Sequence, residues 1–405
     1  MSEWKKVRLG ELCDFINGGA WSDKEYAPEG IPVLKVTNCK NSGFSLSELS
    51  YLPYSLEQKY IQNKLQRNDV IIATVGSHPN LVNSSAGRSV IVNSFVEGFY
   101  LNQNAVCIRT KDQEILDQLF WGYYSKYYLF QNYIQMRGKG AANQMRIAIS
   151  AIKNYPMPLP PINVQRHIAS ILSRYDSLIE NYQKQIKLLE EAAQRLYKEW
   201  FVDLHFPGHE STNIVDGVPE GWEKKSIGEI GEYLNGFAFK PSDWQDLGKP
   251  IIKIKEMGNG VTNETPRNSG ERVPAKYLIK AGDLLFSWSA TLMVIIWSGE
   301  EGWLNQHLFK VTPVKGIDRE FLLQSISNTI VEFQNLTTGS TMKHIQRNKL
   351  DQVFVNVPNA EIMKRYSDIS EKTRSNILSL QSQLRLLTEA RDRLLPKLMS
   401  GEITV

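Results

Sequence analysis

The sequence predicts an α+β protein made of two similar halves, each a mixed α/β globular domain followed by a long helix. Three observations predict this architecture: an internal repeat, short apolar runs bounded by Gly, Asn, Pro and Ser, and two long segments with apolar residues every three or four positions. Alternation of strands with full crossover helices is not evident, which favours α+β over a parallel α/β sheet.

The internal repeat covers almost the whole chain and begins with three matches at one separation of 218 residues. They join residues 4–11 to 222–229, 15–18 to 233–236, and 31–35 to 249–253. At shorter separations, residues 68–72 match 282–286 and residues 101–104 match 304–307. A preserved order with a shrinking separation indicates two domains of one plan that differ by loop insertions.

Each globular domain is predicted to contain both strands and a helix. Apolar runs between turn-forming residues, at 70–75, 89–92 and 284–286, are typical of strands. The aromatic-rich segment 117–135 is predicted to form a helix that packs on a sheet. Its counterpart 319–336 has apolar residues at helical spacing, which predicts the same element in the second half.

Two long helices are predicted, one after each domain. The first series of apolar positions is Ile168, Ile171, Tyr175, Leu178, Tyr182, Ile186, Leu189, Ala193, Leu196 and Trp200. The second series is Ile362, Tyr366, Ile369, Thr373, Ile377, Leu380, Leu384, Leu387, Arg391, Leu394 and Leu398. Such series are typical of a coiled coil, although an amphipathic helix packed on its own domain would look similar. Because similar halves usually pack about a pseudo-two-fold axis, we predict that the two helices pair antiparallel.

Composition leaves several classes of partner open. The 405 residues carry 47 Lys+Arg and 43 Asp+Glu, and this formal charge of +4 permits nucleic-acid binding without requiring it. The three cysteines form no C-x-x-C pair, which indicates neither a disulfide framework nor a cysteine metal site. The N-terminus lacks the apolar run of a signal peptide, and the longest apolar stretch, 284–297, is too short to span a bilayer. We therefore expect a cytoplasmic protein.

Catalytic and metal-binding motifs are not found in the sequence. There is no [DN]-P-P-[YF] tetrad for adenine methylation, no G-x-x-x-x-G-K-[ST] phosphate loop and no H-E-x-x-H pair. His205 and His209 lie four residues apart, but Pro207 and Gly208 between them indicate a linker rather than a helical metal site. We expect no catalytic residue and no bound metal.

The repeated motifs resemble those of the specificity (S) subunit of type I restriction–modification systems. W-x-x-x-x-[LI]-G-E opens each half, and Asn-Gly, [NG]-D-[VL]-[IL] and L-N-Q-[NH] elements follow in the same order. Each half closes with a proline-bounded strand before its long helix. The runs P-P-I-N-V-Q-R-H-I-A at 160–169 and R-L-L-P-K-L-M-S-G-E-I at 393–403 are also typical of the family. Gly-Ser-Thr-Met at 339–342 has only a loose counterpart at 138–144, which is a departure from the family pattern in the first half.

The resemblance implies a complete division of the chain. Residues 1–161 and 206–358 would be target recognition domains, and residues 162–205 and 359–405 would be the conserved helices. Each domain would read one half of a bipartite double-stranded DNA target. The helices would set the spacing and bind two methyltransferase (M) subunits, with restriction (R) subunits joining through the complex and no membrane involved. The chain would bind no cofactor, since S-adenosylmethionine, ATP and Mg are expected on the partner subunits.

The helix length agrees with a spacer between half-sites. A helix of about 36 residues spans roughly 55 Å at ~1.5 Å per residue. Domains at the ends of such a strut would address half-sites about one helical turn of DNA apart.

Candidate DNA contacts are polar residues in the turns of the two domains, because amides and guanidinium groups read base edges and Lys, Ser and Thr bind phosphates. In the first domain they are Lys35, Thr37, Asn38, Lys40, Ser77, His78, Asn80, Arg88, Arg137, Lys139, Asn143, Gln144 and Arg146. In the second domain they are Lys240, Lys253, Lys255, Asn259, Arg267, Ser287, Trp288, Ser340, Thr341, Lys343 and His344. Trp21, Phe237, Phe239 and Trp244 follow the Asn-Gly turns and are interpreted as packing residues in preference to wedges between bases.

Two other functions stay open at the level of the sequence. One is a stand-alone DNA-modification enzyme with a divergent active site. The other is a coiled-coil scaffold that does not bind DNA.

Overall fold

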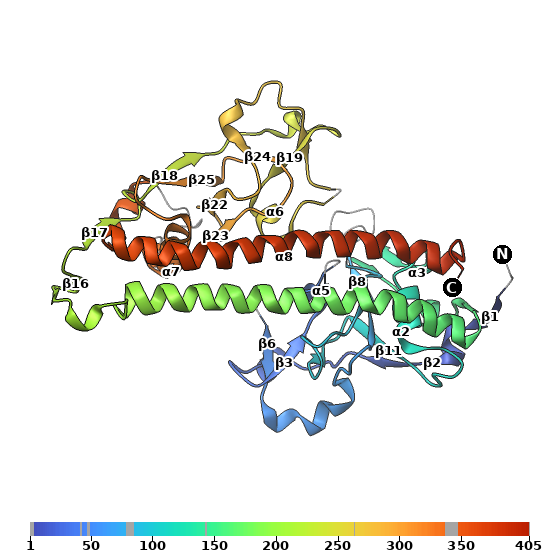
Figure 1. Cartoon of the computed structure of the whole chain (residues 1–405). Coiled ribbons are helices and arrows are strands. Elements are labelled where there is room, and N and C mark those ends of the chain that lie inside the picture. The colour runs from blue at the N-terminus through green and yellow to red at the C-terminus, as the bar shows by residue number, and fades with distance from the viewer. Residues whose placement is uncertain are drawn as a thin grey trace. The chain divides into compact units, whose positions relative to one another are not determined.

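The computed structural model describes residues 4–40, 43–46, 49–77, 85–141, 144–262, 264–336 and 347–404. It divides into two compact units (Figure 1). Unit 1 consists of Met1–Asn181 and Leu386–Val405, and unit 2 consists of Tyr182–Arg385. Each unit therefore holds one globular domain together with a part of both long helices.

Unit 1 is built on two sheets. The first is antiparallel, in the order β2 (Cys13–Asn17), β11 (Ala105–Thr110), β7 (Val70–Ala73) and β9 (Ser89–Ile91). The second has the order β10 (Tyr100–Leu101), β3 (Ile31–Leu34) and β6 (Ser50–Leu52), with β10 and β3 parallel. Smaller pairings join β1 (Lys5–Arg8) to β14 (Pro156–Leu159), β4 (Cys39–Lys40) to β5 (Gly43–Phe44), and β12 (Lys139–Ala141) to β13 (Gln144–Arg146) and β8 (Val75–Gly76). The helices of its domain are α1 (Leu9–Leu12), α2 (Gln118–Tyr124), α3 (Tyr128–Gln135) and α4 (Ile149–Lys153), with 3₁₀ turns at η1 (Asp23–Glu25), η2 (Val36–Asn38), η3 (Tyr54–Leu56) and η4 (Gln58–Asn63).

Unit 2 repeats this plan. Its main sheet has the order β18 (Gly231–Asn235), β25 (Leu308–Pro313), β22 (Leu284–Ser287) and β23 (Met293–Ile296). Its second sheet has the order β20 (Arg267–Asn268), β19 (Lys249–Ile252), β24 (Gly302–Leu304) and β21 (Leu278–Ile279), with β19 and β24 parallel. The pairs β17 (Glu223–Ser226) with β26 (Phe354–Val357) and β15 (Ile214–Val215) with β16 (Val218–Pro219) complete the strands. The helices are α6 (Ile254–Asn259) and α7 (Arg319–Leu336), with 3₁₀ turns η6 (His209–Ser211), η7 (Pro241–Asp243), η8 (Ala275–Tyr277) and η9 (Arg347–Gln352).

The predicted repeat and the α+β class are confirmed by this topology. The main sheets have the same strand order in both units, and each second sheet contains one parallel pair at the matched position. The segments matched in the sequence form matched strands, so the sequence similarity reflects one fold used twice.

The prediction of one helix over residues 117–135 is wrong, because the structure has two helices there, α2 and α3. Tyr127 between them has an extended backbone, and its ring is buried against Tyr124 at 5.6 Å between centroids. The helix is therefore interrupted at the residue whose ring, that of Tyr127, enters the aromatic core. Trp121 and Phe130, on either side, are fully buried in the same core as the sheet.

The repeated motifs have structural roles. An added Cβ at Gly18 would collide with the carbonyl oxygen of Asn102, and one at Gly236 would collide with that of Asn305. The Asn-Gly and L-N-Q-[NH] elements are therefore packed backbone to backbone in both units. The aspartate of the [NG]-D motif closes its own turn, since Asp69 and Asp283 each accept a backbone N–H from three residues earlier.

The two predicted long helices are confirmed. They are α5 (Ile162–Tyr197), which continues into a π-helical turn at Lys198–Val202, and α8 (Ala360–Ser400). They are drawn in green and red in Figure 1. None of the helices in the described ranges is both long and apolar enough to cross a membrane.

Within each unit the two helices run antiparallel. In unit 1, Asp176 of α5 pairs with Arg391 of α8 at 2.6 Å, and Leu172, earlier in α5, shares a core with Leu398, later in α8. In unit 2, the rings of Trp200 and Tyr366 lie 6.1 Å apart, and Glu190, earlier in the first helix, interacts with Arg374, later in α8. The predicted antiparallel pairing is therefore confirmed inside each unit.

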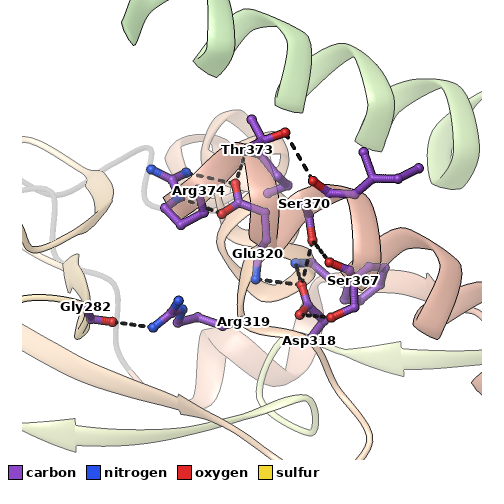
Figure 2. A network of polar contacts seen from close by, with 11 residues as sticks. Gly282, Asp318, Arg319, Glu320, Ser367, Ser370, Thr373 and Arg374 are labelled. Carbon is purple, nitrogen blue, oxygen red and sulfur yellow. Dashed lines mark hydrogen bonds and ion pairs between the residues drawn. The ribbon is translucent and has the colours of Figure 1, made fainter. Parts of the chain in front are cut away.

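A buried polar network fixes α7 to α8 in unit 2 (Figure 2). Arg374 donates to both carboxylate oxygens of Glu320, at 2.8 and 2.9 Å, and both side chains are less than one-tenth exposed. Asp318 caps the start of α7 and also accepts hydrogen bonds from Ser367 and Ser370 of α8. The domain and the helix are thus joined through groups that satisfy one another away from water.

Candidate nucleic-acid interface

The predicted contact residues fall into three groups in the structure. Seven of them lie outside the described residues: His78, Asn80, Asn143, Ser340, Thr341, Lys343 and His344. The others divide between residues with internal roles and residues at the surface of their unit.

Two of the predicted residues are buried. Asn38 is 6% exposed, accepts the backbone N–H of Lys35 and donates to the carbonyl of Ser45. Ser287 is fully buried, and its hydroxyl donates to the carbonyl of Thr291. Both side chains hold neighbouring backbone, and their burial removes them from the surface that DNA would meet.

Other predicted residues are already bonded within their own domain, among them Arg88, Arg267 and Trp288. Arg88 donates to the carbonyl of Cys39 at 2.6 Å. Arg267 donates to the carbonyl of Gly248 and pairs with Glu300. The indole of Trp288 donates to the side chain of Asn235 at 3.2 Å, so this tryptophan secures the Asn-Gly turn.

An electropositive hairpin stands out in unit 1. Lys139 and Arg146 lie directly opposite each other on β12 and β13, and both are exposed. In the described part of the chain, neither forms an ion pair with a carboxylate. Like charges at opposed positions weaken a hairpin, so the pair favours an anion such as phosphate. Gln144 is exposed on the same hairpin and offers an amide suited to a base edge.

The surroundings of the hairpin extend this surface. Met145 of β13 pairs with Gly76 of β8, so the hairpin adjoins the segment that leads to Ser77. Arg137 precedes it, with its guanidinium 3.5 Å from the centroid of the Tyr133 ring. Strand pairing thus brings together predicted residues about 60–70 positions apart in the sequence.

Most of the remaining predicted residues follow the central strand of the second sheet, whereas Lys240 precedes it. Lys35 comes directly after β3 and Lys253 directly after β19. The short helices that follow differ, a 3₁₀ turn at η2 in unit 1 and an α-helix at α6 in unit 2. The other predicted residues of this region are exposed or half-buried: Thr37, Lys40, Lys240, Lys255 and Asn259.

The four aromatic residues after the Asn-Gly turns differ in exposure. Trp21 and Phe239 are buried and Phe237 is half-buried, as expected of packing residues. Trp244 is 48% exposed, and the ammonium of Lys253 lies 4.4 Å from its ring centroid. Tyr26 holds the corresponding position beside Lys35 but was not among the predicted residues. Its separation of 218 residues from Trp244 is the signal that would have identified it.

Two of the cysteines are buried away from any role as nucleophiles. Burial raises the pKa of the Cys13 and Cys39 thiols to about 12, so they stay protonated and weakly nucleophilic near neutral pH. Within the described ranges, no group of three or more His, Cys, Asp or Glu side chains is placed to hold a metal ion.

Comparison with known proteins gives consistent matches over the chain. The family model described as "Type I restriction modification DNA specificity domain" matches residues 1–191 and 219–384. The MjaIX specificity subunit of Methanocaldococcus jannaschii is 26% identical over 63% of this chain and 62% of its own length. The MjaVIII specificity subunit of the same organism is 23% identical over 100% of this chain and 93% of its own length.

A solved structure also has a similar fold. The S subunit of a type I restriction–modification system from M. genitalium matches with a TM-score of 0.54 at 18% identity. The match covers 98% of this chain and 96% of that chain.

Proposed function

The chain belongs to the family of type I restriction modification DNA specificity domains and is a specificity subunit, and from this premise we propose that each of its two globular domains reads one half of a bipartite DNA target. The proposal rests above all on the repeat, in which the same strand order carries different surface loops in the two units. One scaffold with two loop sets suits an asymmetric target whose halves differ in sequence.

The long helices act as the spacer between the two half-sites. Each unit contains an antiparallel helix pair with side-chain bonds between helix and domain, Asp176–Tyr123 in unit 1 and Glu320–Arg374 in unit 2. Bonds of this kind favour a fixed orientation of each domain on its helices. A rigid strut defines a spacing, whereas a flexible linker would blur it.

The chain works without catalysis of its own and with partner subunits. Two methyltransferase subunits bind the outer faces of the helices, and restriction subunits join through the complex. These partners bind S-adenosylmethionine, ATP and Mg, and they modify or cleave the DNA that this chain selects. We expect the assembly in the cytoplasm.

The spacer is tested by lengthening it. One helical turn is inserted near Leu189 of α5 and its antiparallel equivalent in α8, and the variant is assembled with its methyltransferase partner. Methylated sites are then mapped by sequencing. We expect an altered distance between unchanged half-sites or a loss of binding. Normal methylation at the original spacing would contradict the spacer role, and methyl transfer by the isolated chain would contradict the non-catalytic role.

A further inference from the structure

A lysine lies over an aromatic ring at matching positions of the two domains. The Lys35 ammonium lies 4.4 Å from the centroid of the Tyr26 ring, and the Lys253 ammonium lies 4.4 Å from that of the Trp244 ring. Both members of the pair are separated from their counterparts by the 218 residues of the repeat. The two pairs are therefore equivalent positions of one fold. Another matching pairing, Lys59 over Tyr60 and Lys276 over Tyr277, differs because Lys59 is already neutralised by Glu25.

The rings are held by the same turn in both units. Tyr26 ends the 3₁₀ turn η1, and Trp244 ends η7. In each turn a carboxylate accepts the backbone N–H of the residue before the turn: Glu25 from Ser22 at 2.8 Å, and Asp243 from Lys240 at 2.7 Å. The sequences of the two turns differ, yet the ring stands at the same place.

The lysines are also held by matching backbone. Each follows the central strand, and its backbone N–H donates to a side chain three residues later. Lys35 donates to Asn38 at 3.0 Å and Lys253 to Glu256 at 3.1 Å. With the backbone fixed at this point, the long side chain leaves from a defined position, which reduces the entropy lost when it binds a ligand.

The positive charges of these lysines are not neutralised, although the Lys35 ammonium donates to the Ser50 hydroxyl at 2.8 Å. Of the carboxylates that the structure describes, none lies within ion-pair distance of either ammonium. By contrast, Lys255 pairs with Glu264 at 3.7 Å, close to Lys253 in the sequence. A ring face attracts a cation without neutralising it. Burial also lowers the pKa of Lys253, since its ammonium has lost water that an anion would replace.

We propose that the two lysine–aromatic pairs are the sequence-independent phosphate anchors of the protein, one in each domain. Phosphates are alike under both half-sites, whereas the bases differ. A feature that is equal in both units suits the phosphates, and features that differ between the units suit the bases. By this criterion base reading falls to exposed side chains of the segments that follow, Thr37 of η2 in unit 1 and Asn259 of α6 in unit 2. This inference rests on the proposed function.

The test uses the full chain assembled with its methyltransferase partner, and measures DNA affinity at several salt concentrations. Lys35→Gln and Lys253→Gln are compared with Lys64→Gln and Lys249→Gln, two lysines paired with Glu57 and Glu301. We expect each anchor variant to lower the slope of log affinity against log salt by about 0.9. The loss of affinity should be equal on cognate and unrelated DNA, and the control variants should change the slope much less.

The aromatic partners supply a second test. Tyr26→Leu and Trp244→Leu leave the lysine charges in place. The slope of log affinity against log salt should therefore be unchanged, while the affinity falls by a few-fold at each salt concentration. Thermal unfolding of the same samples separates this effect from misfolding.

The outcomes distinguish the anchor from the proposed function. Unchanged salt slopes for Lys35→Gln and Lys253→Gln, in a complex that still binds DNA, would overturn the anchors. A change in base preference at one half-site would also overturn them, because it would assign the lysine to base reading. The wild-type complex could show no preference for a bipartite sequence while the anchor variants still lower the salt slope on unrelated DNA. That result would support the anchors and contradict the proposed function.

Discussion

The two units have one fold but attach their domains to the long helices differently. In unit 2 the attachment is the bidentate Glu320–Arg374 pair, which is almost completely buried. In unit 1 the ion pair between domain and helix is Arg67–Glu180, which is more open to solvent, with the Arg67 side chain 40% exposed. The comparison shows that the strand order is the constant part of the repeat, while the polar contacts around it differ between the copies.

The largest expected effect is the removal of the buried pair in unit 2. Arg374→Ala leaves the Glu320 carboxylate buried without its partner, which should destabilise unit 2 by about 3–5 kcal/mol. Arg67→Ala, the matched change in unit 1, should cost less because its pair with Glu180 is more exposed. Urea unfolding followed by tryptophan fluorescence measures both. Equal losses would contradict the difference between the two attachments.

The next effect should be equal in the two units. Gly18→Ala and Gly236→Ala each place a Cβ against a carbonyl oxygen of the L-N-Q-[NH] element. Each should destabilise its own unit by about 1–3 kcal/mol, because the backbone must move apart. The same unfolding assay applies, with Gly258→Ala as the control, because its Cβ would make only an ordinary contact with the Met293 side chain. If Gly236→Ala left the stability of unit 2 unchanged, the two motifs would not be structurally equivalent.

A smaller effect is expected at the electropositive hairpin of unit 1. Lys139→Gln relieves repulsion across the strands from Arg146, so unit 1 should gain about 0.2–1 kcal/mol in stability. The same variant should bind DNA more weakly, because one phosphate contact is lost. Thermal unfolding and a DNA-binding titration are measured on one preparation. Weaker folding together with unchanged binding would indicate that the hairpin is purely structural.

The smallest effect concerns pH. Burial raises the pKa of Glu190 on α5, with Glu320 adding to the rise and Arg374 opposing it. A raised folded-state pKa means that the ionised carboxylate destabilises the folded state above that pKa and that this cost disappears below the unfolded pKa. Glu190→Gln should therefore stabilise unit 2 at pH 7–8, by less than about 1 kcal/mol, and have no effect near pH 4. A benefit that is the same at both pH values would contradict this account.

Much of the fold could be predicted because its signals are local or repeated. The heptad spacing that includes Ile168 and Tyr366 predicts the long helices, and the repeat predicts matched strands. The break at Tyr127 could not be predicted, because it accompanies the burial of one ring among other aromatic rings that only the folded domain brings together.

The candidate interface was harder to predict, because the polar residue types that contact DNA also form hydrogen bonds with the backbone inside a domain. Asn38 and Ser287 have the chemistry of DNA contacts, yet the structure uses them to hold backbone. Tyr26 was missed because its role depends on contact with the Lys35 ammonium, which the sequence does not show. Comparing matched positions of the two halves identifies such contact residues, which a single segment of sequence does not.

One measurement tests the central claim most directly, that each domain reads its own half-site. Residues 1–155 are replaced by the corresponding domain of another member of the family, and the assembled complex is expressed in cells without other DNA methyltransferases. Genome-wide mapping of the methylated bases then gives both half-sites and their spacing. We predict that one half-site changes while the other half-site and the spacing stay. A change in both half-sites, or in neither, would contradict the account.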